Sequence, residues 1–156
     1  MTTASKPSER YLGAHSFLRT VVVLVALYGT GMVTAGREFA LPIFDGLGFG
    51  PTARLDAKGV EYSLFAFGVL GAVIIGWMSL MYFVLELAAH ENAGVRASAR
   101  KALIASTAVW FTFDTGFSIV TGELEHAAFN LPFLGLLAVP LYTMSTSDNG
   151  QEKKGQ

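Results

Sequence analysis

The sequence contains no cysteine, which excludes a disulfide framework, thiol chemistry, cysteine-attached haem and a zinc ribbon. Charged residues are also scarce, at 15% of the 156 residues, whereas a soluble domain has about 25%. The net charge of −1 and the pI near 6.3 lack the positive excess typical of nucleic-acid binding. Motifs for phosphate loops, dinucleotide binding, serine-hydrolase elbows and zinc proteases are absent as well. We therefore expect neither a nucleic-acid partner nor a cofactor, and the sequence favours a non-enzymatic role.

The chain is instead rich in long apolar runs. Hydrophobic residues make up 52% of it, and the mean hydropathy is +0.47. A helix needs about 20 such residues to cross a hydrocarbon core of ~30 Å, and the alternation of barrel strands is missing. The predicted fold class is therefore all-α and integral to the membrane. We expect an antiparallel four-transmembrane-helix bundle with spans at residues 20–36, 62–85, 102–121 and 127–144.

The predicted transmembrane domain thus covers residues 20–144, between a tail of residues 1–19 and a polar tail of residues 145–156. The composition of the second tail is typical of disorder. The first span has some features of a cleavable signal peptide, but it is longer than a signal core and Arg37 follows it, so retention is favoured. A long Gly- and Pro-rich loop over residues 37–59 precedes the second span, and a turn of about six residues, 121–126, joins the last two.

Lysine and arginine are unequally distributed between the two sides of this bundle. One side, which contains both tails and the connection between the second and third spans, carries eight of them, and the other side carries three. Because positive residues concentrate in cytoplasmic segments, both termini are predicted to be cytoplasmic. The eight are Lys6, Arg10, Arg19, Arg96, Arg100, Lys101, Lys153 and Lys154, and the three are Arg37, Arg54 and Lys58.

Small residues recur every fourth position on the second span, at Gly68, Ala72 and Gly76. Such a stripe lets another helix approach closely, which matters because lipid supplies little hydrophobic force for helix association. Packing inside the bundle is favoured over a dimer interface. Trp77 and Trp110 lie too deep in their spans to be interfacial anchors, so we expect them to be packing groups.

Asp114 is the informative polar residue, because a carboxylate inside a span costs at least ~2.5 kcal/mol and should face the bundle interior or a water-filled cavity. Ser118 lies on the same helical face, four residues later. Across the predicted hairpin, His126 and Asn130 are also four residues apart. These four residues are predicted to line an outward-opening polar cleft, with Glu123 and Glu125 at its mouth.

Three interpretations of this cluster are open. It is a hydrogen-bonded clamp that fixes the hairpin, a cation or proton site, or a redox or metal site. The last is weakly supported, because a metal needs at least three protein ligands. A secondary candidate is Glu86 with His90 at the inner end of the second span; the simpler interpretation is that they reach lipid headgroups or pair with Arg96 and Arg100. No metal site is predicted.

The motif Trp110-Phe111-Thr112-Phe113-Asp114-Thr115-Gly116-Phe117-Ser118, with the later His126-Ala127-Ala128-Phe129-Asn130, resembles the second half of BphX-like four-span bacterial membrane proteins. The resemblance covers residues 100–142, and the four-span layout is also similar to that of DoxX-like proteins. It implies a small multi-pass protein of the bacterial inner (cytoplasmic) membrane. The family's function is unknown, so no site residue is carried over from it.

The leading functional hypothesis is an accessory protein or complex subunit that works through helix contacts with itself or with another membrane protein in the lipid bilayer. The alternative is a small oligomeric transporter or ligand-binding protein whose site is centred on Asp114.

Single cysteines introduced at Ser5, Ser98 and Gly48 test the orientation, because the chain has no cysteine of its own. In intact cells, a membrane-impermeant thiol reagent is expected to label the Gly48→Cys protein and neither of the others. Labelling of Ser5→Cys or Ser98→Cys from outside, or protection of Gly48→Cys, would contradict the predicted topology.

Overall fold

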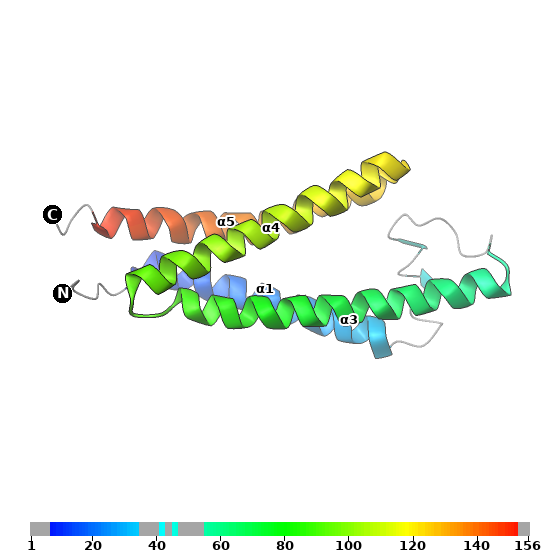
Figure 1. The fold of residues 1–156 in the computed structure, drawn as a ribbon, viewed down its shortest axis with the longest axis horizontal. Coiled ribbons are helices and arrows are strands. Elements are labelled where there is room, and N and C mark those ends of the chain that lie inside the picture. The colour runs from blue at the N-terminus through cyan, green and yellow to red at the C-terminus, as the bar shows by residue number, and fades with distance from the viewer. Residues whose placement is uncertain (1–6, 35–40, 43–44, 47–54, 153–156) are drawn as a thin grey trace.

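The computed structural model describes residues 7–34, 41–42, 45–46 and 55–152 (Figure 1), so most of the predicted loop 37–59 lies outside the described residues. Within these ranges the elements are helical, and no strand occurs. Four long helices follow one another: α1 (Glu9–Thr34), α3 (Ala57–Ala88), α4 (Ala93–Thr121) and α5 (Leu124–Glu152). All four have the length and composition to cross a membrane. The all-helical prediction with four membrane-span-like helices is therefore confirmed.

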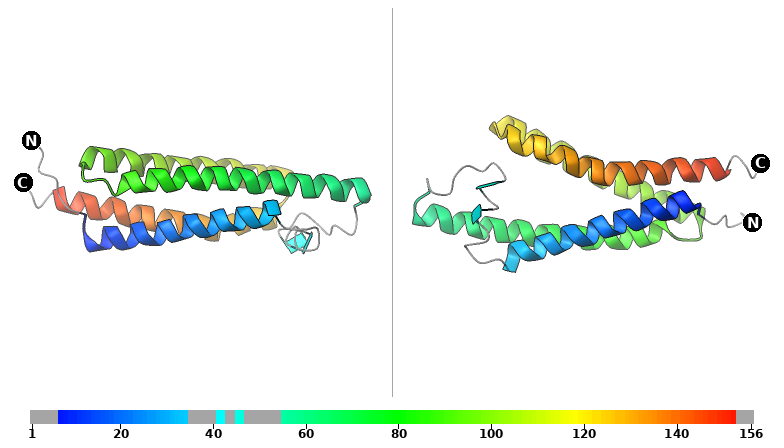
Figure 2. Two further views of the ribbon diagram at one scale, coloured as in Figure 1. Left: turned by 90° about the horizontal axis from the view of Figure 1, so that it is seen from below. Right: turned by 180° about the vertical axis from the view of Figure 1, so that it is seen from behind.

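The helices form a bundle in which each helix has two main neighbours. α1 packs against α3 and α5, and α4 packs against the same two helices, with the most extensive contact between α1 and α3. Both chain ends lie at the end of the bundle where α3 connects to α4, and the α4–α5 turn lies at the other end (Figures 1 and 2). Towards that turn, the α4–α5 pair diverges from the α1–α3 pair.

Local capping explains where the helices begin. Ser8 Oγ accepts a hydrogen bond from the Tyr11 amide at 3.3 Å, and α1 begins at the next residue, Glu9. Asp56 accepts from the Gly59 amide at 2.7 Å, and Asn92 accepts from the Gly94 amide at 2.9 Å. Each side-chain oxygen satisfies an amide that has no partner inside its helix, which is the usual role of Ser, Asp and Asn at this position.

Both predicted tails contain helix. α1 begins at Glu9 rather than at the membrane-span boundary, because Tyr11 and Leu18 are buried and His15 is 7% exposed, so the first turns pack in the bundle. α5 continues to Glu152, so the prediction of disorder after Ser145 is wrong for residues 145–152. Once a helix is formed, each further residue adds a hydrogen bond without a new nucleation step, and no proline interrupts this segment.

The main hydrophobic core joins all four helices in the half of the bundle that contains the chain termini. Trp77 and Trp110 pack against it with their ring centroids 5.7 Å apart, which confirms them as packing groups. The Trp77 indole N–H donates to Ser106 Oγ at 2.9 Å, so its polar atom is satisfied. The buried core residues are Tyr11, Leu18, Val21, Val22, Met78, Met81, Leu85, Ala88, Ala99, Leu103, Leu137, Leu141 and Met144.

Gly29 of α1 and Gly71 of α3 meet at a close contact between the two helix backbones. A Cβ atom added to Gly71 would lie 2.7 Å from the Gly29 carbonyl oxygen, and one added to Gly29 would lie 2.9 Å from the Gly71 carbonyl oxygen. Neither position has room for a side chain. Backbone contact of this kind is how membrane helices associate without hydrophobic force between them.

The predicted packing stripe does not make this contact. A Cβ atom at Gly68 or Gly76 would meet nothing within 4 Å, and Ala72 is exposed. The interpretation of the stripe as internal packing is therefore wrong. Successive residues of a helix are rotated by about 100°, so Gly68, Ala72 and Gly76 lie roughly 60–140° around α3 from Gly71 and face outwards.

Gly71→Ala is expected to destabilise the folded protein by about 1–3 kcal/mol, because the new methyl group would press against backbone that cannot move aside. Gly68→Ala is the matched control, since it places the same methyl group on the same helix in open space. The measurement is the thermal unfolding midpoint of each purified protein in a mild detergent. Equal midpoints for the two variants would contradict the close contact.

Candidate functional site

The turn between α4 and α5 brings the predicted site residues together. Gly122 has φ +84°, in the left-handed region that glycine adopts without steric cost. Its amide donates to the Ile119 carbonyl at 3.1 Å, and the Glu123 amide donates to the Ser118 carbonyl at 2.8 Å. These two bonds form a Schellman motif, which ends α4 and turns the chain back into α5 after two residues.

The Asp114 carboxylate is the centre of the cluster. Asn130 Nδ2 donates to Asp114 Oδ2 at 2.7 Å and to Thr115 Oγ1 at 3.1 Å. His126 Nε2 lies 3.5 Å from the same carboxylate oxygen. Asn130 is only 3% exposed, so the side-chain amide that joins the two helices is almost completely shielded. One carboxylate on α4 is thus held by two side chains of α5.

Ser118 takes part in a different way from the one predicted. Its hydroxyl donates to the backbone carbonyl of Asp114 at 2.7 Å, a bond within α4 that is not directed at the carboxylate. Thr115 instead receives the second hydrogen bond of Asn130. Sequence reasoning did not single out Thr115, although it directly follows Asp114, because a threonine next to a charged residue carries no periodic signal.

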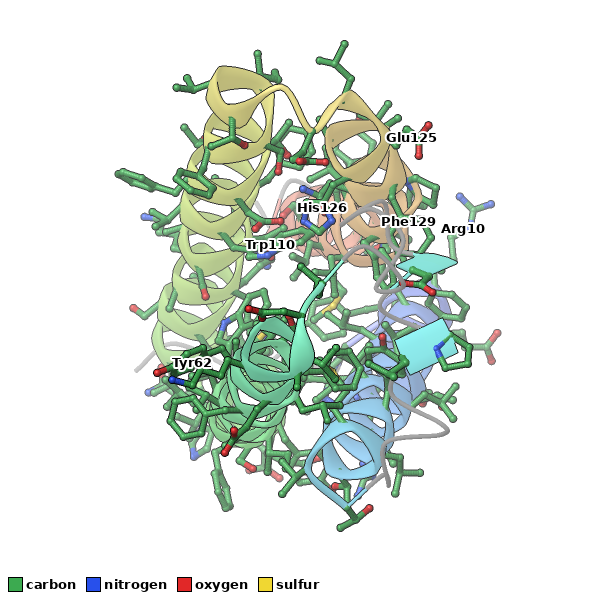
Figure 3. The ribbon with its side chains drawn as sticks, turned by 90° about the vertical axis from the view of Figure 1, so that its right-hand side faces the viewer. Arg10, Tyr62, Trp110, Glu125, His126 and Phe129 are labelled. Atoms are coloured by element: carbon green, nitrogen blue, oxygen red, sulfur yellow. The ribbon has the colours of Figure 1, made fainter. Side chains whose placement is uncertain are left out.

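The carboxylate is accessible from one side. The Asp114 side chain is 38% exposed and the His126 side chain 20% exposed. In Figure 3, His126 points inwards, towards the space enclosed by the four helices, whereas Glu125 points away from it. Glu123 is also exposed, so the two glutamates lie around the turn as solvated groups.

Neither of two grooves in the described part of the chain, one between α1 and α3 and one beside the α3–α4 connection, is lined by Asp114. Nor do three or more His, Cys, Asp or Glu side chains gather among the described residues in a way that could hold a metal ion. What the arrangement offers is a carboxylate and an imidazole side by side, which can hold a proton or a small cation.

The secondary candidates, Glu86 and His90, have separate surroundings. Glu86 lies 3.4 Å from the Arg19 guanidinium, a partner on α1. His90 Nδ1 accepts a hydrogen bond from the Asn92 amide at 3.0 Å and belongs to the turn before α4. The Arg96 guanidinium donates to the backbone carbonyls of His90 and Glu91, at 3.2 and 3.1 Å.

The sequence analysis missed a set of buried polar groups at this end of the bundle. The Tyr11 hydroxyl donates to the Ala88 carbonyl, and His15 Nε2 lies 3.0 Å from the Leu85 carbonyl. Arg96 is only 1% exposed. The spacing of Tyr11 and His15 by four residues, with Leu18 next on the same face, was the available signal that the tail forms a packed helix.

Comparison with protein-family models finds no match, and comparisons with curated proteins and with solved structures find none either. The resemblance of residues 100–142 to BphX-like proteins therefore stays a prediction. The length and composition of its four long helices are those of membrane spans. Any further functional conclusion depends on its own geometry.

Proposed function

We propose that this chain is an accessory protein or complex subunit of the bacterial inner membrane, which acts without catalysis through helix contacts with itself or with another membrane protein. In this proposal the bundle is antiparallel and both termini are cytoplasmic. The support is the run of four apolar helices, the two chain ends at one end of the bundle, and the excess of lysine and arginine in the segments at that end.

The observation that carries this proposal is the unused small-residue stripe on α3. Gly68, Ala72 and Gly76 face outwards, while the bundle's own close contact uses Gly71. In lipid, a stripe with this spacing allows a second helix to approach to backbone distance, where van der Waals packing and weak hydrogen bonds favour association. The bundle leaves this surface free for another molecule.

The large side chains beside the stripe are exposed too. Val69 is 47% exposed and Val73 61% exposed, and they border Gly68 and Ala72 on α3. A partner helix that lies along the stripe also contacts this aliphatic edge. This arrangement favours a helix as the bound element over a soluble domain.

A second candidate function is favoured by the state of Asp114. The Asp114 side chain is 38% exposed, and His126 lies beside it. This accessibility supports a small transporter or ligand-binding protein that takes a proton or monovalent cation at Asp114, with Asn130 and Thr115 as the orienting groups. A chain of this size would enclose a pathway only as an oligomer, so the two candidates are compatible.

An Ala72→Cys protein is expected to form a disulfide-linked dimer under mild oxidation in native membranes if the stripe contacts a second copy. Val139→Cys is the matched control, because Val139 is 64% exposed on α5, away from the stripe. The sequence has no other cysteine to form competing bonds. The measurement is the fraction of dimer on a non-reducing gel. A second measurement is the mass of the wild-type particle in a gentle detergent.

An equal dimer fraction for the two cysteine positions, together with a strictly monomeric wild-type particle that carries no co-purifying protein, would contradict the proposed role. A second protein that co-purifies with the wild type, and is lost from Ala72→Phe, supports the subunit form of the proposal over the homo-oligomer.

Asp114→Asn tests the second candidate, because it keeps the shape of the side chain and removes its charge. If Asp114 binds a monovalent cation, the wild-type unfolding midpoint rises with added Na⁺ or K⁺ by a few degrees, since a ligand at about ten times its Kd stabilises by about 1.4 kcal/mol. Asp114→Asn is expected to abolish that rise, while Ser118→Ala keeps it. A lower midpoint for Asp114→Asn at every salt concentration, with no cation effect in the wild type, would identify the cluster as a clamp only.

A further inference from the structure

A groove of about 240 Å³ lies between α1 and α3 on the outside of the bundle. Val23 and Leu27 are exposed along its α1 side, and Phe83 is 68% exposed on its α3 side. Two hydroxyls in the groove are used within their own helices: Thr30 Oγ1 donates to the Ala26 carbonyl at 3.0 Å, and Ser79 Oγ donates to the Ile75 carbonyl at 2.8 Å. The groove thus presents an apolar surface.

One end of the groove is charged. Tyr82 lines it, and the Arg19 guanidinium lies over the Tyr82 ring, 5.2 Å from its centroid, and donates from Nε to the Tyr82 hydroxyl at 3.1 Å. Arg19 Nε also lies 3.4 Å from Glu86 Oε1. The Arg19 and Glu86 side chains are 51% and 44% exposed, so a cation and an anion stand side by side, both accessible.

The length of the α1 segment along the groove matches the thickness of one leaflet of a bilayer. The helical rise from Arg19 to Thr30 is ~16 Å, at about 1.5 Å per residue. Half of a hydrocarbon core of ~30 Å is ~15 Å. The uncharged run of α1 also begins directly after Arg19, at Thr20. With Arg19 at the headgroup level, the groove therefore extends to the middle of the membrane.

We propose that this groove holds an acyl chain of a phospholipid whose headgroup carries both a phosphate and a primary ammonium, as in phosphatidylethanolamine. Arg19 binds the phosphate, Glu86 binds the ammonium, and Tyr82 positions the guanidinium. An isolated arginine would favour any anionic lipid, but an adjacent carboxylate repels a headgroup with net negative charge. The charge pair is complementary to a zwitterion.

This inference rests on insertion of the bundle in a membrane and not on dimer formation, and the stripe residues are not among those that line the groove. If the protein is monomeric but binds the lipid, the proposed subunit role is contradicted and the lipid site is supported. If it forms a dimer but shows no lipid preference, the lipid site is contradicted and the subunit role is supported.

The test uses the full chain, purified in a non-ionic detergent, with added phosphatidylethanolamine or phosphatidylglycerol of identical acyl chains. Native mass spectrometry gives the apparent Kd of the first bound lipid. The wild type is expected to bind phosphatidylethanolamine about tenfold more tightly, which corresponds to ~1.4 kcal/mol. Glu86→Gln is expected to remove this preference, and Arg19→Gln to weaken the binding of both lipids.

Ser79→Phe fills the groove and is expected to weaken phosphatidylethanolamine binding about tenfold (~1.4 kcal/mol). Thr112→Phe is the matched control, because it adds the same ring at an exposed position on α4, away from the groove. The headgroup variants remain informative even if Ser79→Phe folds poorly, since an exposed ion pair contributes little to stability.

Equal binding of the two lipids by the wild type, or unchanged binding by Ser79→Phe, would overturn the proposal. A shift in oligomer mass for Ser79→Phe without a change in lipid binding would also overturn it, because a second copy of the chain would then occupy the groove.

Discussion

The rest of the structure depends on the backbone contact between Gly29 and Gly71. Two helices can touch at this distance only where neither has a side chain, and each carbonyl oxygen lies under 3 Å from the Cβ that the opposite glycine lacks. The contact sets how α3 is rotated against α1. That rotation turns Gly68, Ala72 and Gly76 outwards, and the shallow groove with Tyr82 at its end lies between the same two helices.

Polar groups stabilise the bundle at both ends. Near the chain termini, partners of α1 and α3 follow one another in order: Tyr11 with Ala88, His15 with Leu85 and Arg19 with Tyr82. At the other end, Asn130 joins α5 to the Asp114 carboxylate of α4. Where such groups are buried, a hydrogen-bonding partner within the protein offsets the cost of removing them from water.

Two of the surfaces with functional interest are adjacent on α3, and the third is separate from them. The small-residue stripe lies on the outer face of α3, the groove lies between α1 and α3, and the Asp114 cluster belongs to the α4–α5 hairpin. Ser79 and Phe83 of the groove lie about 80° and 120° around α3 from Gly71, in the same sector as the stripe.

The sequence by itself determined the four apolar helices and the packing of the two tryptophans, because hydropathy and span length follow directly from composition along the chain. It also brought Asp114, His126 and Asn130 close together through the short turn. Only the tertiary structure decided which glycines face inwards. Gly71 and Gly68 differ by three positions and look alike in a periodic pattern, and the rotation of α3 depends on the shape of α1.

The rotation of one helix against another also explains the remaining differences between the sequence predictions and the structure. Arg19 was identified as a partner of Glu86 only when α1 was placed beside α3. Thr115 was identified as the second acceptor of Asn130 only when α5 was placed beside α4. A helical sequence shows which residues share a face, but the angle between two helices decides which of those faces meet.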